Sequence, residues 1–482
     1  MNEYMSSIIL FTIAFMVSLV VYPLVLRFAV RHDIVDNPDA RKLQRHPVPV
    51  MGGVVVYIGI LVAVLVGYFV FEVKESMCVI VCMSVMLVLG TTDDIRGLGV
   101  GIRFLIELIA VTAIVLFTGY SIDDFHGFLG IHHISPFVSW PLSIVAGVGI
   151  INATNLIDGV DGYSSGYGVM SCSLFAVLFF LTGHTNEAMF ALIVAAAIIP
   201  FFMHNVFGKK SKMFIGDGGT LMLGMALTSF LFYSLSSNGA CVNFGGVNPV
   251  ALSIAILAVP VFDTVRVMGG RISKGRSPFH PDKTHLHHLF IDLGFSHVGT
   301  AVAILTINFT VVVLCWLGWS IGLNDSWQII ISVVLGFLIT FGIYNSVRRF
   351  ESHDSKMYVF LCNVGRATHI ERQGVWLALS LIIDGEWRKG NVVKEVKRQV
   401  KKYDVETYKA ELNRTLVPKE RDVCLIKAYL EGKTNVSVDD IIKFSGADNL
   451  RVYPIIYQMV LDENVVVIKQ NDLGQIKRVQ LK

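Results

Sequence analysis

The sequence is poor in charged residues. Only 16% of its 482 residues are Asp, Glu, Lys or Arg, whereas 54% are hydrophobic. Apolar runs recur down to about residue 347, and they reach the ~20 residues that a membrane-spanning helix needs. This composition excludes a protein that is soluble throughout and predicts a polytopic membrane protein.

Cysteine is also scarce. The chain has seven Cys, an odd number, and no C-x-x-C pair. We therefore expect neither a disulfide framework nor a metal site built on cysteine. The first thirty residues lack a basic n-region and an A-x-A-like cleavage site, so we expect them to form a retained first span and not a removed signal peptide.

The apolar runs predict an all-α bundle of eleven transmembrane helices over residues 1–350. The expected spans are 5–30, 50–71, 77–91, 102–119, 137–153, 163–182, 187–206, 217–235, 249–270, 299–320 and 326–347.

Basic residues are distributed unevenly between the connections of these spans. Residues 1–347 contain sixteen of the forty Lys and Arg, and fifteen of the sixteen lie in or beside alternate connections, with only Lys74 in the others. Because cytoplasmic loops carry an excess of Lys and Arg, these alternate connections are expected to be cytoplasmic. Eleven spans then place the N-terminus outside and the C-terminus inside, where the tail holds the remaining twenty-four basic residues (40 minus 16).

Residues 351–482 have the composition of a soluble cytoplasmic α/β domain. Apolar and aromatic runs at 356–383 and an amphipathic pattern at 391–413 predict a mixed α/β piece over 351–415. From 416 to 482 the pattern indicates three helices and a strand–turn–strand, as in a winged helix. The basic residues form no dense patch, so we expect no nucleic-acid partner and favour a module that contacts a protein.

Polar residues gather in the connections predicted to be cytoplasmic. Among them are "TTDDIRGLGVGIR" (91–103), "NATNLIDGVDG" (152–162), "FGKKSKMFIGDGGT" (207–220) and a His-rich loop at 271–290. Their oxygen donors suit Mg²⁺, which takes one or two carboxylates plus substrate phosphates, and Mn²⁺ is the expected substitute. These donors are Asp93, Asp94, Asn155, Asp158, Asp161 and Asp217. Segments remote in sequence thus share one face, as a composite active site requires.

Each of these features also has a plain structural interpretation. Asp93 and Asp94 can end a helix at the membrane interface, and the Asp-Gly motifs can be turns. "GDGGT" opens the eighth span and can point free N–H groups at an anion. His285, His287 and His288 have a spacing that can hold zinc, but no Cys is nearby, so we favour contact with phosphate.

Taken together, these motifs resemble the polyprenyl-phosphate N-acetylhexosamine-1-phosphate transferases. The resemblance covers about residues 1–350 and rests on Asp93-Asp94, the N-x-x-N-x-x-D-G-x-D-G motif at 152–162, Gly216-Asp217 and the His-rich loop at 279–290. "SPFHPDKTHLHHL" is most similar to the bacterial branch that transfers GlcNAc-1-phosphate, and less similar to the MurNAc-pentapeptide enzyme.

The resemblance implies roles for particular residues. It makes Asp217 a Mg²⁺ ligand with Asn155 as co-ligand, and it places Asp93 and Asp94 beside the lipid phosphate and Asp158 and Asp161 in the nucleotide and metal site. It assigns substrate binding to the polar side chains Asn152, Asn155, Arg103, His280, His285, His287 and His288. At Arg103 many relatives carry Lys, and Arg keeps the charge but changes the donor geometry.

The activity implied is transfer of a HexNAc-1-phosphate from its UDP-sugar to undecaprenyl phosphate, a membrane lipid, with release of UMP. The implied setting is the cytoplasmic face of a bacterial inner membrane, where the product starts an envelope glycan. A homodimer is expected by resemblance alone, and the C-terminal domain lies outside the family core.

Several alternatives stay open at this point. The sequence does not choose between direct displacement and an aspartyl-phosphoryl intermediate, nor among HexNAc donors. A secondary transporter also has many spans and acids, although transporters place binding residues near the midplane and often in repeated halves. A receptor whose tail is the output is a further alternative.

Overall fold

The computed structural model describes residues 3–36, 48–71, 77–242, 244–278, 283–352, 356–369, 374–385, 426–427, 429–431, 433–445, 449–461, 465–470 and 476–481. The chain forms two compact units. One comprises Met1–Leu289 and His297–Arg348, and the other comprises Phe290–Ser296 and Arg349–Lys482. The units divide between residues 348 and 349, and the sequence did not indicate that 290–296 belongs to the second unit.

The prediction of eleven spans is confirmed, because eleven helices in the described residues are long and apolar enough to cross a membrane. Ten are single helices: α1 (Glu3–Arg31), α2 (Gly52–Phe71), α3 (Met77–Arg96), α4 (Val100–Thr118), α5 (Pro136–Leu156), α6 (Tyr163–Leu181), α7 (Thr185–Phe207), α8 (Gly216–Leu235), α9 (Pro249–Ile272) and α11 (His297–Ser320). The eleventh, Asp325–Glu351, joins α12 (Asp325–Phe337), a π-helical turn η1 (Leu338–Gly342) and α13 (Ile343–Ser352).

Local signals explain where several helices begin. The Asn248 side chain accepts hydrogen bonds from the backbone N–H groups of Val250 and Ala251, and Pro249 occupies the first position of α9. The Asn324 side chain accepts one from Trp327 at the start of α12. Asn at the N-cap satisfies donors that the helix leaves unpaired, and Pro at the first position loses no hydrogen bond.

Helix α8 is the centre of the bundle. Every residue of its most apolar 18-residue window is buried, which holds for no other candidate span in the described residues. Glycines allow this close packing, because a side chain on Gly90 of α3 would collide with the Asp217 backbone and one on Gly224 would lie 2.6 Å from the Ile151 Cα of α5. The helices around α8 therefore hold its first turn in a fixed place.

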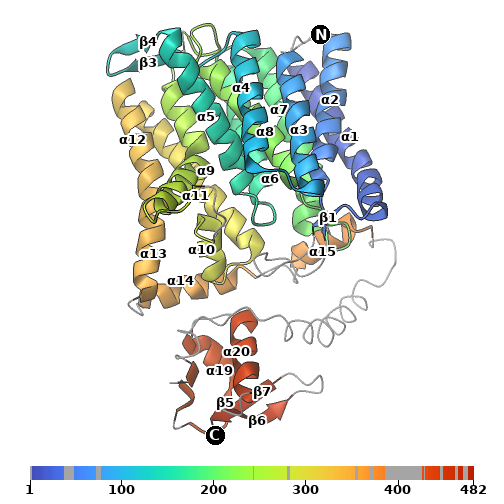
Figure 1. Ribbon diagram of the computed structural model, residues 1–482, viewed down its shortest axis with the longest axis vertical. Coiled ribbons are helices and arrows are strands. Elements are labelled where there is room, and N and C mark those ends of the chain that lie inside the picture. The colour runs from blue at the N-terminus through green and yellow to red at the C-terminus, as the bar shows by residue number, and fades with distance from the viewer. Residues whose placement is uncertain are drawn as a thin grey trace. The chain divides into compact units, whose positions relative to one another are not determined.

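The two ends of the bundle carry different structures (Figure 1). The antiparallel hairpin of β3 (Asp124–Phe128) and β4 (Ile131–His133) lies at the same end as the N-terminus. At the opposite end lie the short pair of β1 (Val35–Asp36) and β2 (Val48–Pro49) and the helix α10 (Leu286–Asp292). We call this second end the site end, because the connections that follow α1, α3, α5, α7 and α9 meet there.

The second unit contains α14 (Lys356–Ala367), α15 (Gly374–Ile383), β5 (Val436–Ser437), α19 (Val438–Ser445), α20 (Asn449–Leu461), β6 (Val465–Gln470) and β7 (Ile476–Leu481). The described part of 356–383 is helical, and the mixed α/β character predicted for 351–415 stays a prediction. In α14, the buried residues Tyr358, Cys362 and Gly365 recur at the spacing of one helix face. The helix expected at 391–413 lies outside the described residues.

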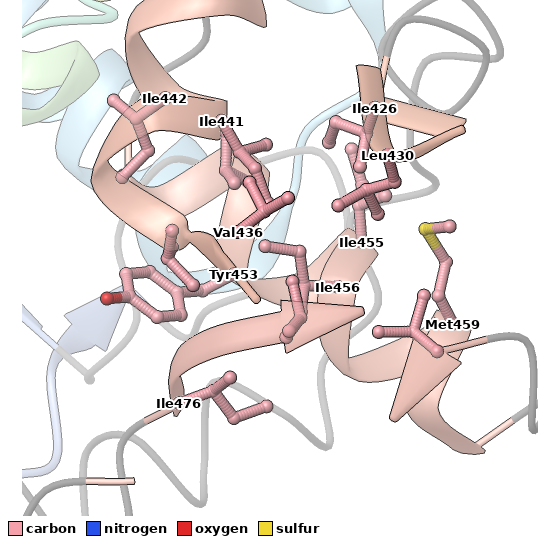
Figure 2. Packing of buried hydrophobic residues seen from close by; sticks show 14 residues of the cluster. Ile426, Leu430, Val436, Ile441, Ile442, Tyr453, Ile455, Ile456, Met459 and Ile476 are labelled. Atoms are coloured by element: carbon pink, nitrogen blue, oxygen red, sulfur yellow. The ribbon is translucent and has the colours of Figure 1, made fainter. Parts of the chain in front are cut away.

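The last part of this unit has its own small core. Ile441 of α19, Ile455 and Ile456 of α20 and Ile476 of β7 are buried together, as Figure 2 shows. The strands form an antiparallel sheet in the order β5-β7-β6. Two helices and a hairpin follow in the expected order, and the short strand β5 was not expected. The first of the three expected helices lies mostly outside the described residues, and the winged-helix assignment stays a prediction.

Candidate active site

Arg103 joins two aspartates that are far apart in the sequence. Its Nη1 donates to Asp93 Oδ2 at 2.6 Å and to Asp217 Oδ2 at 2.9 Å. Asp93 lies in the last turn of α3 and Arg103 in the first turn of α4. The connection between them is closed by the Leu98 N–H, which donates to Asp93 Oδ1 at 2.5 Å. The side chains are 12%, 19% and 34% exposed for Asp93, Arg103 and Asp217, so the group is half-buried and Asp217 is its most open member.

Asn155, at the end of α5, completes this group. Its amide Nδ2 donates to Asp217 Oδ1 and to Thr220 Oγ1, each at 2.9 Å, while its Oδ1 accepts from Arg103 Nη2 at 3.4 Å. The predicted residues Asp93, Arg103, Asn155 and Asp217 therefore meet at one point, from α3, α4, α5 and α8. We call these four residues the Arg103 cluster.

Asp94 has a different surrounding from Asp93. Backbone hydrogen bonds from Asp217 and Gly218 reach its carboxylate, and α8 has no capping side chain from its own Ile215. Gly216 has φ +73°, and a Cβ there would lie 2.5 Å from Asp94 Oδ2. The group at the N-terminus of α8 is thus the Asp94 carboxyl group, which accepts hydrogen bonds from the N–H groups that the sequence suggested for a ligand.

Asp158 lies in the connection between α5 and α6 and accepts a hydrogen bond from Ser164 Oγ at 2.5 Å. Burial raises the pKa of Asp158 to about 7, and the charges of Asp217 and Asp161 add to this increase, whereas the Ser164 hydroxyl opposes it. This carboxyl group therefore changes its charge near neutral pH.

Asp161, three residues later, is held by Lys212 and His297. Lys212 Nζ lies 2.5 Å and His297 Nδ1 2.9 Å from its Oδ2. Burial alone would raise the pKa of Asp161, but His297 and Lys212 outweigh it and lower the pKa to about 2. The neighbouring Gly162 N–H donates to Asn205 Oδ1 at 2.7 Å. Asp161, in the α5–α6 connection, thus contacts the α7–α8 connection and the start of α11. The sequence had suggested neither His297 nor Asn205 as part of the site.

Asn152 lies one helical turn deeper than Asn155. Its Nδ2 donates to Glu107 Oε2 at 2.5 Å and to the Val148 carbonyl at 2.9 Å. Glu107, on α4, is 1% exposed, and its second oxygen has no hydrogen-bond partner within the described part of the chain. Asn152 therefore supports the floor of the site, in contact with an acid buried in a span.

The histidines of the last connection lie beside the α5–α6 connection. The His287 ring occupies the space that a side chain on Gly159 would need. It stacks 5.7 Å from the parallel ring of His285, and the tilted ring of His288 lies 4.3 Å away. Burial lowers the pKa of His287, and the neighbouring histidines lower it further, so this ring is neutral. His280 lies outside the described residues.

Two residues of α9 near these histidines were missed by the sequence analysis. Asp263 Oδ2 lies 2.9 Å from His285 Nδ1, and Asp263 Oδ1 lies 2.6 Å from Arg266 Nη2. Their signal in the sequence is a pair of opposite charges three residues apart at the end of an apolar run, a spacing that places them on one helix face.

The donors of the site fit a hard cation better than zinc. Asp217 and Asn155 offer oxygen atoms, and Mg²⁺ needs only one or two carboxylates besides phosphate and water. Within the part of the chain that the structure describes, no three His, Cys, Asp or Glu side chains converge on a ready metal site. Arg103 donates to Asp217 Oδ2 and Asn155 Oδ1, which are oxygen atoms that could also bind a cation. The guanidinium therefore supplies a positive charge at the position that attracts a cation.

Comparison with known proteins gives concordant results. The model of glycosyl transferase family 4 matches residues 76–235, which include the Arg103 cluster. A probable undecaprenyl-phosphate N-acetylglucosaminyl 1-phosphate transferase of Bacillus subtilis (strain 168) is 31% identical over 303 residues, 63% of this chain and 82% of that protein.

Two further relatives are named undecaprenyl-phosphate alpha-N-acetylglucosaminyl 1-phosphate transferase. The protein of Yersinia pestis is 26% identical over 317 residues, 65% of this chain and 84% of its own length. The protein of Escherichia coli (strain K12) is 29% identical over 274 residues, 55% of this chain and 70% of its own length.

Proposed function

The chain belongs to glycosyl transferase family 4, and from this premise we propose that it transfers N-acetylglucosamine 1-phosphate from its UDP-linked donor to undecaprenyl phosphate. It is a phosphotransferase of the membrane. The observation that carries the proposal is the Arg103 cluster, because four helices bring two carboxylates, an amide and a guanidinium to one point at the site end. Other UDP-HexNAc donors are the alternative substrates.

In the proposed reaction, a phosphate oxygen of the lipid attacks the β-phosphorus of the donor. A new P–O bond forms to the lipid phosphate, the bond to the UMP oxygen breaks, and UMP leaves with the electron pair. A phosphate monoester has its second pKa near ~6 and is mostly dianionic at neutral pH. No strong base is therefore required for the attack.

The chain contributes charge and orientation to this reaction. Arg103, fixed by Asp93 and Asp217, offsets negative charge on the phosphates, as preorganised cations do in phosphoryl transfer. Asp217 and Asn155 are the residues that would hold Mg²⁺, and a bound Mg²⁺ supplies Lewis-acid stabilisation of the diphosphate. Mn²⁺ suits the same oxygen donors.

Direct displacement fits the surroundings of the aspartates better than a covalent intermediate. The Asp93 carboxylate is bound by Arg103 and the Leu98 N–H, and the Asp94 carboxylate by the first turn of α8. Asp161 is bound by Lys212 and His297. A nucleophile needs an available lone pair and an activating base, so these carboxylates serve better to position groups.

The excess of basic residues in the connections at the site end supports a cytoplasmic site, since the positive-inside rule places such connections in the cytoplasm. UDP-sugars are cytosolic, and a lipid phosphate lies at the interface, so both substrates can reach this end. We infer a bacterial inner membrane location, with the product starting an envelope glycan. A homodimer and a protein partner for the C-terminal domain are further parts of this proposal.

The test is UMP release by the detergent-purified protein given UDP-GlcNAc, undecaprenyl phosphate and Mg²⁺. We expect release that needs the lipid, is abolished by a chelator and falls at least ~10³-fold in Asp217→Asn, because charge stabilisation of the transition state is the largest catalytic contribution. Asp325→Asn is the matched control, since Asp325 begins α12 away from the site end and its loss should leave the rate unchanged. Uptake of a UDP-sugar into proteoliposomes without UMP release would instead support a transporter.

A further inference from the structure

Asp263 is a buried carboxylate whose two oxygens face different groups. Its side chain is 4% exposed. Oδ1 accepts hydrogen bonds from Arg266, at 2.6 Å from Nη2 and 3.2 Å from Nε. Oδ2 accepts one from the Leu286 N–H at 3.1 Å and lies 2.9 Å from His285 Nδ1. Each oxygen thus faces two nitrogen atoms, those at Oδ1 both belonging to Arg266.

These contacts determine which nitrogen of His285 carries a proton. A carboxylate paired with a guanidinium is ionised and can only accept hydrogen bonds. His285 Nδ1 must therefore carry the hydrogen, which leaves a lone pair on Nε2 when the ring is neutral. The hydrogen bond made by one ring nitrogen sets the state of the other in this way.

His285 Nε2 is buried and has no hydrogen-bond partner among the described residues, although a buried acceptor without a partner costs free energy. Arg266, the other partner of Asp263, is also held in place, since its Nη2 donates to the Thr284 carbonyl at 2.6 Å and its guanidinium lies 3.9 Å from the centre of the Tyr344 ring. The parallel ring of His287 lies between His285 and Gly159. A held acceptor beside the site end points to a ligand that donates a hydrogen bond.

We propose that Asp263 is a positioning residue that fixes His285 in its Nδ1–H form, so that Nε2 accepts a hydrogen bond from a hydroxyl or amide group of the UDP-sugar. This inference rests on the proposed function, because that function brings a UDP-sugar to this end of the bundle. It adds a residue of α9, outside the polar loops, to the recognition of the donor.

The direct test is ¹⁵N NMR of the full-length protein labelled at histidine and held in lipid nanodiscs. The His285 signals are assigned by their loss in His285→Gln. We expect a protonated Nδ1 and an unprotonated Nε2 in the wild-type protein, and a shift of the Nε2 signal when UDP-GlcNAc is added. A protonated Nε2, or an Nε2 signal that UDP-GlcNAc leaves unchanged, would overturn the proposal even if no UMP is released.

Kinetics of Asp263→Asn give a second, independent readout. An amide keeps an oxygen toward only one of these two groups. The variant therefore turns its NH₂ either toward His285 Nδ1, which favours the Nε2–H form, or toward the Arg266 guanidinium, which also donates, so that the fixed Nδ1–H form is weakened. We expect the KM for UDP-GlcNAc to rise ~10–100-fold, the effect of losing one buried hydrogen bond, with the KM for undecaprenyl phosphate unchanged.

A double-mutant cycle separates positioning from a structural role. In the His285→Gln background, Asp263→Asn should cause no further rise in the KM for UDP-GlcNAc, because residues that act through one another are not additive. Additive losses would contradict the proposal, as would equal effects on both substrates. Asp123→Asn is the matched control, since Asp123 accepts two hydrogen bonds from Ser237 far from the site end. Absence of UMP release by the wild-type protein would reject the proposed function and leave the NMR test intact.

Discussion

At the scale of the residue, identical side chains in this site have different charge states. Asp158 and Asp161 are three positions apart, yet burial and neighbouring acids raise the pKa of Asp158 to about 7, while His297 and Lys212 lower that of Asp161 to about 2. The sequence indicated both as donors for a metal or nucleotide but could not separate them. Their difference depends on partners more than forty residues away, on α11 and before α8.

Asp158 predicts a pH dependence of stability with a definite sign. Its pKa is raised from 3.8 to about 7 on folding, so the folded protein binds this proton more tightly than the unfolded chain. The resulting stabilisation is complete below the unfolded pKa and is lost as the pH rises through about 7. Asp158→Asn, which keeps an acceptor for Ser164, should therefore gain stability relative to wild type between pH 4 and 8.

This prediction is checked by thermal unfolding of both proteins in one detergent across that pH range. The difference in Tm should grow with pH and become constant above about 8, where Asp158 is ionised in both states. Parallel curves for the two proteins would contradict the assignment, and Asp325→Asn should give a parallel curve because Asp325 is exposed.

At the scale of the element, α8 shows how the N-terminus of one helix can be capped by a residue of a neighbouring helix. Its first turn has no cap from its own chain and instead donates hydrogen bonds to Asp94 of α3. Gly90, one turn before Asp94, permits the contact because any side chain there would meet the Asp217 backbone. The placement of Asp217 is thus a property of the α3–α8 pair.

Replacing Asp94 tests this capping role. Asp94→Ala removes the acceptor and should lower the free energy of unfolding by ~0.5–2 kcal/mol, the cost of a lost helix cap. Asp94→Asn retains an acceptor and should lose less stability. Chemical unfolding in mixed micelles measures both, and equal losses in the two variants would show that the N–H groups of α8 do not depend on Asp94.

The sequence predicted the spans well because each is a long apolar run, and length alone decides such an assignment. It did not predict helices at 356–383, because short apolar runs fit a strand or a helix equally, nor α10, which has seven residues. For the site, motif positions identified the Arg103 cluster. The sequence did not indicate Asp263 and His297 as site residues. Asp263 contacts His285, 22 positions away, and His297 contacts Asp161, 136 positions away, and no local pattern shows such contacts.

At the scale of the whole molecule, the two units are interleaved along the sequence, because a segment of the second unit lies between two segments of the first. Residues 290–296 belong to the second unit, where the Ser296 N–H donates to Thr368 Oγ1 at 2.9 Å and His369 Nε2 lies 3.0 Å from the Gly294 carbonyl. This segment directly follows His287 and His288 and directly precedes His297. The residues just after α14 therefore contact the end of the connection that leads into His297.

Two truncations distinguish this part of the tail from the remainder. A chain ending at residue 385 keeps α14 and the residues after it, and should release UMP at close to the full rate. A chain ending at residue 352 loses the partners of 290–296 and should be ~10-fold slower or worse, since small displacements of positioning residues are costly. The assay uses membranes with matched amounts of each protein. Full activity of the shorter chain would show that 290–296 keeps its place without α14.

The burial of α8 also bears on how the protein is made. Its mean hydropathy of 1.4 is the lowest among the eleven candidate spans in the described residues, and its apolar window is wholly surrounded by protein. A newly inserted α8 would expose Thr220, Thr228 and Ser234 to lipid until neighbouring helices close around it. The helix that carries Asp217 thus reaches its native surroundings only when the bundle assembles.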